Sequence, residues 1–189
     1  MSPVSDVGYI GLGNIGKPSA TRLLRGPWQT HVYDVDETAS LDLAKLGAVS
    51  SASPAELAAR CQHIGICVRD ETQVEALLYG EQGLFNNAAA GTLIAIHSTV
   101  TFAALNRWGN DASRADLQLV DAAITGGQQG AAAGTLCYMV GGSTENLDRA
   151  RPIFATSAET IVHAGALGAG MLLKLCNNLI TYAEFMAMS

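Results

Sequence analysis

The segment GLGNIG at residues 11–16 constrains the fold of this 189-residue chain more than any other segment. It follows the short apolar run 7–10 and opens the stretch 14–25, whose apolar residues have helical spacing. Asp34 closes the next strand-like run, at about the 20-residue distance of a ribose-binding carboxylate. Three glycines at this spacing, between a strand and a helix, predict a dinucleotide-binding unit.

Each glycine of this segment has a separate physical role in the prediction. Gly11 permits a tight turn, and Gly13 lets the backbone approach a pyrophosphate at the positive end of the helix. Gly16 lets the helix pack closely against the strand. The alternative interpretation is a cluster of turn glycines without a ligand. The predicted cofactor-binding residues of the segment are Gly11, Leu12, Gly13, Asn14, Ile15 and Gly16.

Asp34 predicts NAD in preference to NADP. Its carboxylate can accept hydrogen bonds from the adenosine ribose hydroxyls, and its charge would repel a 2′-phosphate. A solvated aspartate is the alternative. Neighbouring Lys17 could contact a phosphate, but a solvated position on the helix face is the favoured interpretation.

Strand-like and helix-like segments alternate along most of the chain. The runs 30–34, 63–68, 92–97 and 117–124 read as strands, and helical patterns separate them. This alternation predicts an α/β fold with a Rossmann-type, doubly wound, mostly parallel sheet. The Gly/Ala-rich segment 126–136 is expected to be a connection into a further strand. A capping box, with Ser53 as N-cap and Glu56 as its partner, predicts a helix start.

Ligands of open α/β sheets bind at the carboxyl ends of the strands. That rule selects Val68 and Arg69 after one strand and Ser98 and Thr99 after the next as cofactor-binding candidates. The Thr99 hydroxyl could hold a ribose or the carboxamide. A helix N-cap is the alternative role for Ser98 and Thr99.

Two later segments carry polar groups in apolar surroundings. Thr125, Gly126 and Gly127 follow a strand and offer a hydroxyl and bare N–H groups that can hold a carboxylate; a hairpin-like turn is the alternative. In the final helix, Gly170, Lys174 and Asn178 share one face, and Asn177 adds a second amide. Burial would lower the pKa of Lys174 toward a value suited to acid–base chemistry, whereas a snorkelling lysine is the alternative.

The composition excludes several classes of partner. The formal charge of −6 and the scattered basic residues argue against nucleic acid and against an anionic membrane surface. The amino terminus has no signal-peptide pattern, and the four cysteines without CxxC pairs favour a reducing, cytoplasmic location. Cys61 and His63 could suggest a metal, but no second ligand pair follows, so no metal site is predicted.

Three motifs in order resemble the β-hydroxyacid dehydrogenase family, which includes 3-hydroxyisobutyrate dehydrogenase. They are VGYIGLGNIGKPSA, DAAITGGQQGAAAGTL and GAGMLLKLCNNL. The resemblance implies an NAD-dependent oxidoreductase that interconverts a small β-hydroxy acid and its semialdehyde or keto acid. It implies that Lys174 is the catalytic acid and base and that Thr99, Val68 and Arg69 contact the nicotinamide half. The substrate-binding residues that it implies, with Asn177 added from its place on the helix, are Thr125, Gly126, Gly127, Asn177 and Asn178.

The chain departs from the family pattern at several positions. Ala123 replaces a proline, Thr125 replaces a serine, and His97 stands where an acidic residue often precedes Ser-Thr. These departures affect substrate identity more than the class of reaction. Imine reductases resemble the family but usually lack the lysine, and the related 6-phosphogluconate dehydrogenase has KxxHN in place of the Lys174 motif.

The resemblance also implies a domain division. Residues 1–164 are expected to form the NAD-binding Rossmann domain, and residues 165–189 the start of a long helix that leads to an absent all-helical domain. That domain would close the site and build a homodimer or higher oligomer around a small carboxylate substrate. A cofactor-binding piece without activity by itself, or an imine-reductase-like enzyme, remains an alternative.

Overall fold

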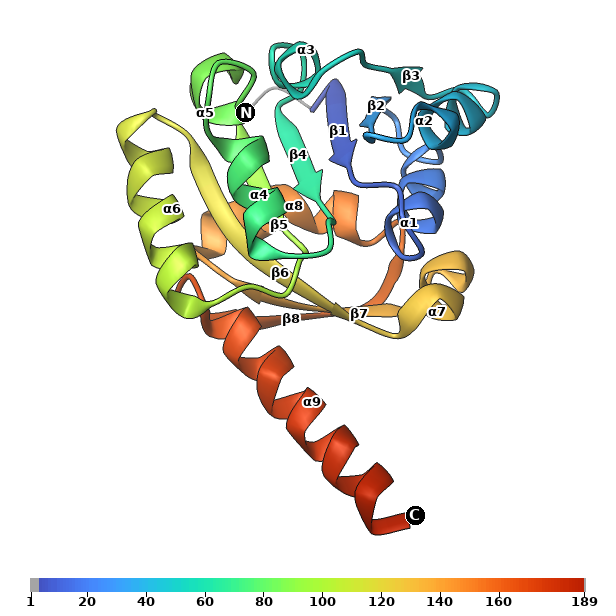
Figure 1. The fold of residues 1–189 in the computed structure, drawn as a ribbon, viewed down its shortest axis with the longest axis vertical. Coiled ribbons are helices and arrows are strands. Elements are labelled where there is room, and N and C mark those ends of the chain that lie inside the picture. The colour runs from blue at the N-terminus through green and yellow to red at the C-terminus, as the bar shows by residue number, and fades with distance from the viewer. Residues whose placement is uncertain (1–3, 189) are drawn as a thin grey trace.

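Eight strands form one sheet in residues 4–188, the part of the chain that the computed structural model describes (Figure 1). The strands are β1 (Asp6–Ile10), β2 (Gln29–Tyr33), β3 (Val49–Ser50), β4 (His63–Ile66), β5 (Leu93–Ile96), β6 (Gln118–Thr125), β7 (Leu136–Gly141) and β8 (Ala158–Gly165). The helices are α1 (Gly16–Leu23), α2 (Glu37–Ala44), α3 (Pro54–Ala58), α4 (Glu71–Leu78), α5 (Leu84–Asn87), α6 (Phe102–Arg114), α7 (Gly127–Ala133), α8 (Thr144–Phe154) and α9 (Ala169–Met188).

The order of the strands across the sheet is β3-β2-β1-β4-β5-β6-β7-β8. All neighbouring pairs are parallel except β6 and β7, which are antiparallel. The chain therefore winds outward from β1 to one edge, returns to the centre at β4, and winds to the other edge. This arrangement confirms the predicted doubly wound, mostly parallel sheet, and it makes the carboxyl ends of β1 and β4 the point where ligands of such sheets bind.

The core lies on both faces of the sheet because strand residues alternate between them. Ile64, Ile66 and Ile94 face a cluster that includes residues of α3, α4, α5 and α6, with Trp108 fully buried in it. On the other face, residues of β1, β2 and β6 pack against α1, α2 and α8. Burial on both faces explains why the central strands read as continuous apolar runs.

Side chains fix the starts of several helices. The predicted helix start with Ser53 as N-cap is confirmed, because Ser53 Oγ accepts a hydrogen bond from the Glu56 N–H at 3.1 Å, but the reciprocal bond goes to the residue before Ser53. The Glu56 carboxylate in turn accepts one from the Ala52 N–H at 2.8 Å. Side-chain caps of the same kind begin further helices, with the capping residues Asp36, Asp70, Thr101 and Ser143.

The structure corrects one expectation about the connections. The segment after β6, expected only as a Gly/Ala-rich connection into a further strand, contains a helix that was not predicted, since residues 127–133 form α7. Gly126 and Gly127 have φ of 120° and 62°, and Gly134 ends the helix in a left-handed conformation at 79°. The alanines between these glycines are strong helix formers, so the run folds as one short helix once its ends are set. The short elements β3 and α5 were also not predicted.

The final helix, α9, starts against the sheet and then runs away from it (Figure 1). At its start, a Cβ atom on Gly170 would collide with the carbonyl oxygen of Met139 in β7, so the glycine permits close contact between helix and strand. Beyond its first turn, the helix exposes large apolar side chains, among them Leu179 and Tyr182. No helix in residues 4–188 is both long enough and apolar enough to cross a membrane.

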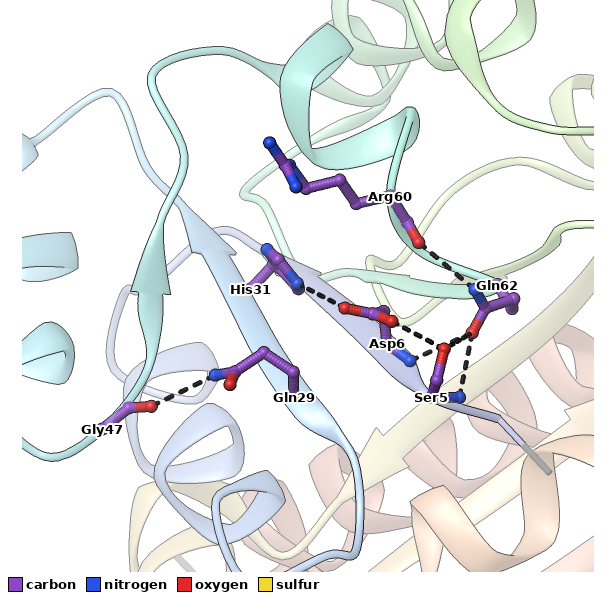
Figure 2. A network of polar contacts seen from close by, with 7 residues as sticks. All are labelled: Ser5, Asp6, Gln29, His31, Gly47, Arg60 and Gln62. Atoms are coloured by element: carbon purple, nitrogen blue, oxygen red, sulfur yellow. Dashed lines mark hydrogen bonds and ion pairs between the residues drawn. The ribbon is translucent and has the colours of Figure 1, made fainter.

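A polar network closes the opposite end of the sheet, at the amino ends of the strands (Figure 2). Asp6 accepts a hydrogen bond from the Ser5 hydroxyl at 2.6 Å, and its other oxygen lies 2.8 Å from His31 Nε2. The side-chain oxygen of Gln62 accepts from the N–H groups of Ser5 and Asp6, at 3.0 Å each. The network thus joins the first residue of β1 to β2 and to the residue before β4.

We expect Asp6→Asn to destabilise the fold modestly, and only above acidic pH. The hydrogen bonds from Ser5 and His31 hold the pKa of Asp6 below its ordinary value. A carboxylate whose pKa is lower in the folded state contributes stability above its unfolded pKa of about 3.9, and that stability is lost as the pH falls through the folded value. In urea unfolding, the variant should have a free energy of unfolding lower by up to about 1 kcal/mol near neutral pH. Below pH ~4 the two proteins should have the same free energy of unfolding. The exposed residue Asp148 supplies the control variant Asp148→Asn; equal losses in both variants would contradict the expectation.

Candidate functional site

A cavity of about 960 Å³ opens where the carboxyl ends of β1, β2 and β4 meet. It contains most of the predicted cofactor-binding residues. Those that line it are Gly11, Gly13, Asn14, Ile15, Gly16, Asp34, Val68 and Arg69. Its further lining includes Val35, Ser53, Pro54, Gln73 and Leu77.

The three glycines of the first loop occupy environments that match their predicted roles. Gly11 has φ of 93°, and a Cβ atom there would collide with the carbonyl oxygen of Cys67 in the neighbouring chain segment. A Cβ atom on Gly16 would collide with the carbonyl oxygen of Gly11, so the helix lies very close to the turn. A Cβ atom on Gly13 would meet no heavy atom within 4 Å. The absence of a side chain at Gly13 therefore leaves open space in the cavity, and close packing of the protein does not require a glycine there.

The start of α1 fits an anionic group. The residue before the helix is Ile15, which gives the helix no side-chain cap. The N–H groups of a first helical turn have no partner within the helix, and the helix dipole favours negative charge there. Together with the open space at Gly13, this is the geometry that binds a pyrophosphate. Lys17 does not contribute to it, because its ammonium group pairs with Asp42 on α2 at 2.9 Å.

Asp34 is held in a fixed orientation at the end of β2. One of its oxygens accepts a hydrogen bond from the Leu12 N–H at 2.5 Å, and the other accepts from the Asp36 N–H at 2.9 Å. Leu12 itself is buried and does not line the cavity. Each carboxylate oxygen can accept a further hydrogen bond, so the group remains available to two ribose hydroxyls.

We expect Asp34→Asn to weaken NAD binding by about 10- to 100-fold, because hydrogen bonds to a charged group contribute about 1.5–3 kcal/mol each. The same change should weaken NADP binding less, since it removes a charge that repels the 2′-phosphate. The double variant Asp34→Asn with Val35→Arg should favour NADP, because Val35 lies at the cavity and is 89% exposed. Calorimetric titration gives both affinities, with Asp36→Asn as the control. An unchanged ratio of the two affinities would reject the role of Asp34.

The predicted residues after β5 lie outside the cavity. The Ser98 hydroxyl accepts a hydrogen bond from the Val68 N–H at 2.9 Å and donates one to the Val68 carbonyl oxygen at 2.8 Å. The buried Ser98 side chain thus holds the loop after β4 by binding the backbone of Val68. Thr99 is exposed, and neither residue lines the cavity.

None of the predicted substrate-binding residues lines the cavity. Thr125 ends β6, whose carboxyl end points the same way as that of parallel β5. It pairs across the antiparallel strands with Cys137 of β7. The helices that follow the two loops, α1 and α7, pack side by side (Figure 1). Arg22 of α1 joins them by donating hydrogen bonds to the carbonyl oxygen of Ala132, at 3.1 and 2.6 Å.

The polar face of α9 is partly covered. Beyond Met171, the described residues that are partly buried are Lys174, Asn177 and Asn178, whereas the leucines of this part of the helix are exposed. Partial burial lowers the pKa of Lys174, and the neighbouring Cys137 opposes that effect. Conversely, partial burial raises the pKa of Cys137, and the positive charge of Lys174 lowers it. Cys137 is the strand partner of Thr125, and α9 packs against both of their strands, β7 and β6.

Two residues of this region were missed from the sequence. Cys137 is one, and nothing in its local sequence marks it. The other is Asp121 in β6, which is fully buried. A charged residue inside the mostly apolar run 117–124 is a signal that could have identified it, because a buried carboxylate needs dedicated partners.

Metal-binding groups do not gather in residues 4–188, where no cluster of three or more candidate ligands occurs. Burial raises the pKa of Cys61 to about 12 and lowers that of His63 to about 3. The Cys61 thiol is therefore held protonated, which disfavours it as a metal ligand.

Residues 6–165 match the family described as the NAD binding domain of 6-phosphogluconate dehydrogenase. The match covers most of the chain, and the chain belongs to this family. The glycine loop, the open space at Gly13 and the fixed Asp34 all lie within the matched residues.

Curated relatives agree with this assignment. The chain is 38% identical over 192 residues to the NAD-dependent L-serine dehydrogenase of Pseudomonas aeruginosa, covering 98% of this chain and 64% of the relative. It is 34% identical over 177 residues to 3-hydroxyisobutyrate dehydrogenase of the same organism, covering 94% of this chain and 59% of the relative. The predicted resemblance is confirmed, and the chain spans 59–64% of the length of these two relatives.

Solved structures show the same fold. A structure of Mycobacterium tuberculosis 3-hydroxyisobutyrate dehydrogenase with L-serine has a TM-score of 0.91 at 30% identity, covering 97% of this chain and 62% of that one. An imine reductase from Myxococcus stipitatus in complex with NAD⁺ has a TM-score of 0.90 at 19% identity, covering 100% of this chain and 64% of that one. At that identity the second likeness concerns the fold alone.

Proposed function

We propose that the protein is an NAD-dependent oxidoreductase that interconverts a small β-hydroxy acid and its semialdehyde or keto acid, with Lys174 as acid and base. The observation that carries the proposal is the partly covered polar face of α9. Lys174 lies on that face, in a helix that packs against β6 and β7, the strands of Thr125 and Cys137. NAD is the proposed cofactor in preference to NADP, because Asp34 presents a fixed negative charge to the ribose end of the cavity.

The proposed residues divide the chemistry between them. The nicotinamide of a bound NAD would accept the hydride from the substrate carbon. Thr125, with the backbone of Gly126 and Gly127, would hold the substrate carboxylate, and Asn177 and Asn178 would orient the substrate. A neutral Lys174 would take the proton of the substrate hydroxyl during oxidation, and a protonated Lys174 would return it during reduction. Burial lowers the pKa of Lys174, which favours the neutral form that accepts the proton.

We further propose that residues 1–164 form the NAD-binding domain and that residues 165–189 begin the connection to a second, helical domain. Relatives of greater length and the apolar side chains exposed on α9 support this division. The alternative is a cofactor-binding piece without activity by itself. The observation that favours it is the limited cover over Asn177 and Asn178, which are only partly buried.

A substrate panel tests the proposal. Residues 1–189 and a chimera in which they replace the matched part of the P. aeruginosa L-serine dehydrogenase would be assayed for NADH formation. We expect activity with β-hydroxy acids, among them L-serine and 3-hydroxyisobutyrate, and none with α-hydroxy acids. Activity of the chimera alone would favour the inactive-piece alternative for the 189 residues. Activity with neither class of acid in the chimera would reject the proposal.

A further inference from the structure

Asp121 is a fully buried carboxylate in the middle of β6. Its two oxygens accept hydrogen bonds from the N–H groups of Gly168 and Met171, both at 2.6 Å. These donors lie 47 and 50 residues further along the chain, at the start of α9. Burial raises the pKa of Asp121, and the N–H donors oppose that rise.

The start of α9 has N–H groups that require a partner. The residues at this end, Gly168 and Ala169, have no side chain that can accept a hydrogen bond. Elsewhere in the fold a residue next to the helix supplies the cap, as Asp70 does for α4 by accepting from the Gln73 N–H at 2.9 Å. At α9 the cap comes from a different strand, and its negative charge lies at the positive end of the helix.

The surrounding backbone is shaped to admit this carboxylate. A Cβ atom on Gly141 of β7 would collide with Asp121 Oδ1 and would approach the Ala169 nitrogen. Gly170 has no space for a Cβ atom either, because Met139 of β7 lies against it. Strand β7 and helix α9 therefore approach each other closely at Gly141 and Gly170, and the Asp121 carboxylate lies at this contact.

Asp121 connects the two parts of the proposed substrate site. Thr125 lies four residues after Asp121 on β6, which is about 13 Å along a strand. Lys174 lies three residues after Met171 on α9, which is about 4.5 Å along the helix axis. A change in how Asp121 holds α9 would thus move Lys174 relative to Thr125.

We propose that Asp121 is a positioning residue that fixes the start of α9 on β6 and so holds Lys174 at the substrate loop. The link to catalysis rests on the proposed function of Lys174, whereas the link to the placement of Lys174 does not. Asp121 acts through the helix and contacts neither substrate nor cofactor.

The test uses Asp121→Asn in the 189-residue chain. Asparagine keeps the shape but leaves only one acceptor for the two N–H groups, so one of them loses its bond. The chain has three lysines, Lys17, Lys45 and Lys174, so reductive ¹³C-methylation and NMR resolve the environment of each. We expect the Lys174 signal to move and its titration to shift upward, toward the ordinary lysine value, with the Lys17 signal unchanged. The amide protons of residues 168 and 171 should also lose hydrogen-exchange protection.

The matched control is Asp70→Asn, which removes a carboxylate cap from α4 and should leave Lys174 unchanged. A second variant, Asp121→Glu, keeps the charge but lengthens the side chain, and should also displace the Lys174 signal. An unchanged Lys174 signal in both folded Asp121 variants would overturn the proposal. Failure of both variants to fold would overturn it too, since the carboxylate would then hold the sheet as a whole.

In the chimera, Asp121→Asn should lower kcat while the affinity for NAD stays within about twofold. If Lys174→Ala retained turnover, the proposed function would fail, but a displaced Lys174 signal in Asp121→Asn would still support the positioning role. The two hypotheses are therefore tested separately.

Discussion

Gly13→Val is expected to abolish measurable NAD binding, a loss of at least about 100-fold, while the protein remains folded. Position 13 has open space around it and no positive φ, so the fold tolerates a side chain there. The added methyl groups would instead occupy the space where the pyrophosphate approaches the backbone, at the start of α1. Fluorescence or calorimetric titration with NAD measures the loss, and thermal unfolding without ligand checks the fold.

Gly16→Val provides the comparison, because it changes a glycine of the same loop in a different environment. Its side chain would collide with the carbonyl oxygen of Gly11, so the variant should unfold at lower temperature or fail to fold. The contrast separates a ligand-facing glycine from a packing glycine. If Gly13→Val bound NAD normally, the pyrophosphate would have to lie elsewhere.

Lys174→Ala is expected to lower turnover of the chimera by about 10²- to 10⁴-fold, the range that a general acid or base contributes. The affinity for NAD should be unchanged, because Lys174 does not line the cofactor cavity. The loss should appear in kcat, since proton transfer occurs in the transition state. Steady-state kinetics measures it, with the exposed residue Lys45 changed to alanine as the control.

The pH dependence gives a second readout of the same prediction. Oxidation needs neutral Lys174, so its rate should rise as the pH passes upward through the lysine pKa, which burial has lowered. Lys174→Ala should remove that rise. Turnover of Lys174→Ala at the rate of the unchanged protein would refute the acid–base role.

Most of the fold could be predicted because its signals are local. The apolar run 63–68 reads as a buried strand, and Ser53 with Glu56 marks a helix start within four residues. By contrast, α7 was missed because its glycines suggest an irregular segment. Only the left-handed conformation of Gly134 and the packing against α1 show that the alanines form a helix.

The site could be predicted in part for the same reason. The face shared by Lys174 and Asn178 follows from helical spacing alone, and the structure shows that this face is partly covered. Ser98 was placed correctly at a strand end, but its sequence cannot show that Val68 takes both of its hydrogen bonds. The partners of Asp121 could not be assigned, because they lie about 50 residues away along the chain and meet it only in the folded sheet.

The central claim is that the proposed enzyme moves a hydride between a β-hydroxy acid and NAD. The most direct test supplies the chimera with NAD and 3-hydroxyisobutyrate that carries deuterium on the carbinol carbon. Mass spectrometry of the NADH formed in a single turnover is the measurement. We expect the label on the nicotinamide ring, and far less labelled NADH with Lys174→Ala. NADH formed without the label, or no reduced cofactor with any β-hydroxy acid of the panel, would contradict the claim.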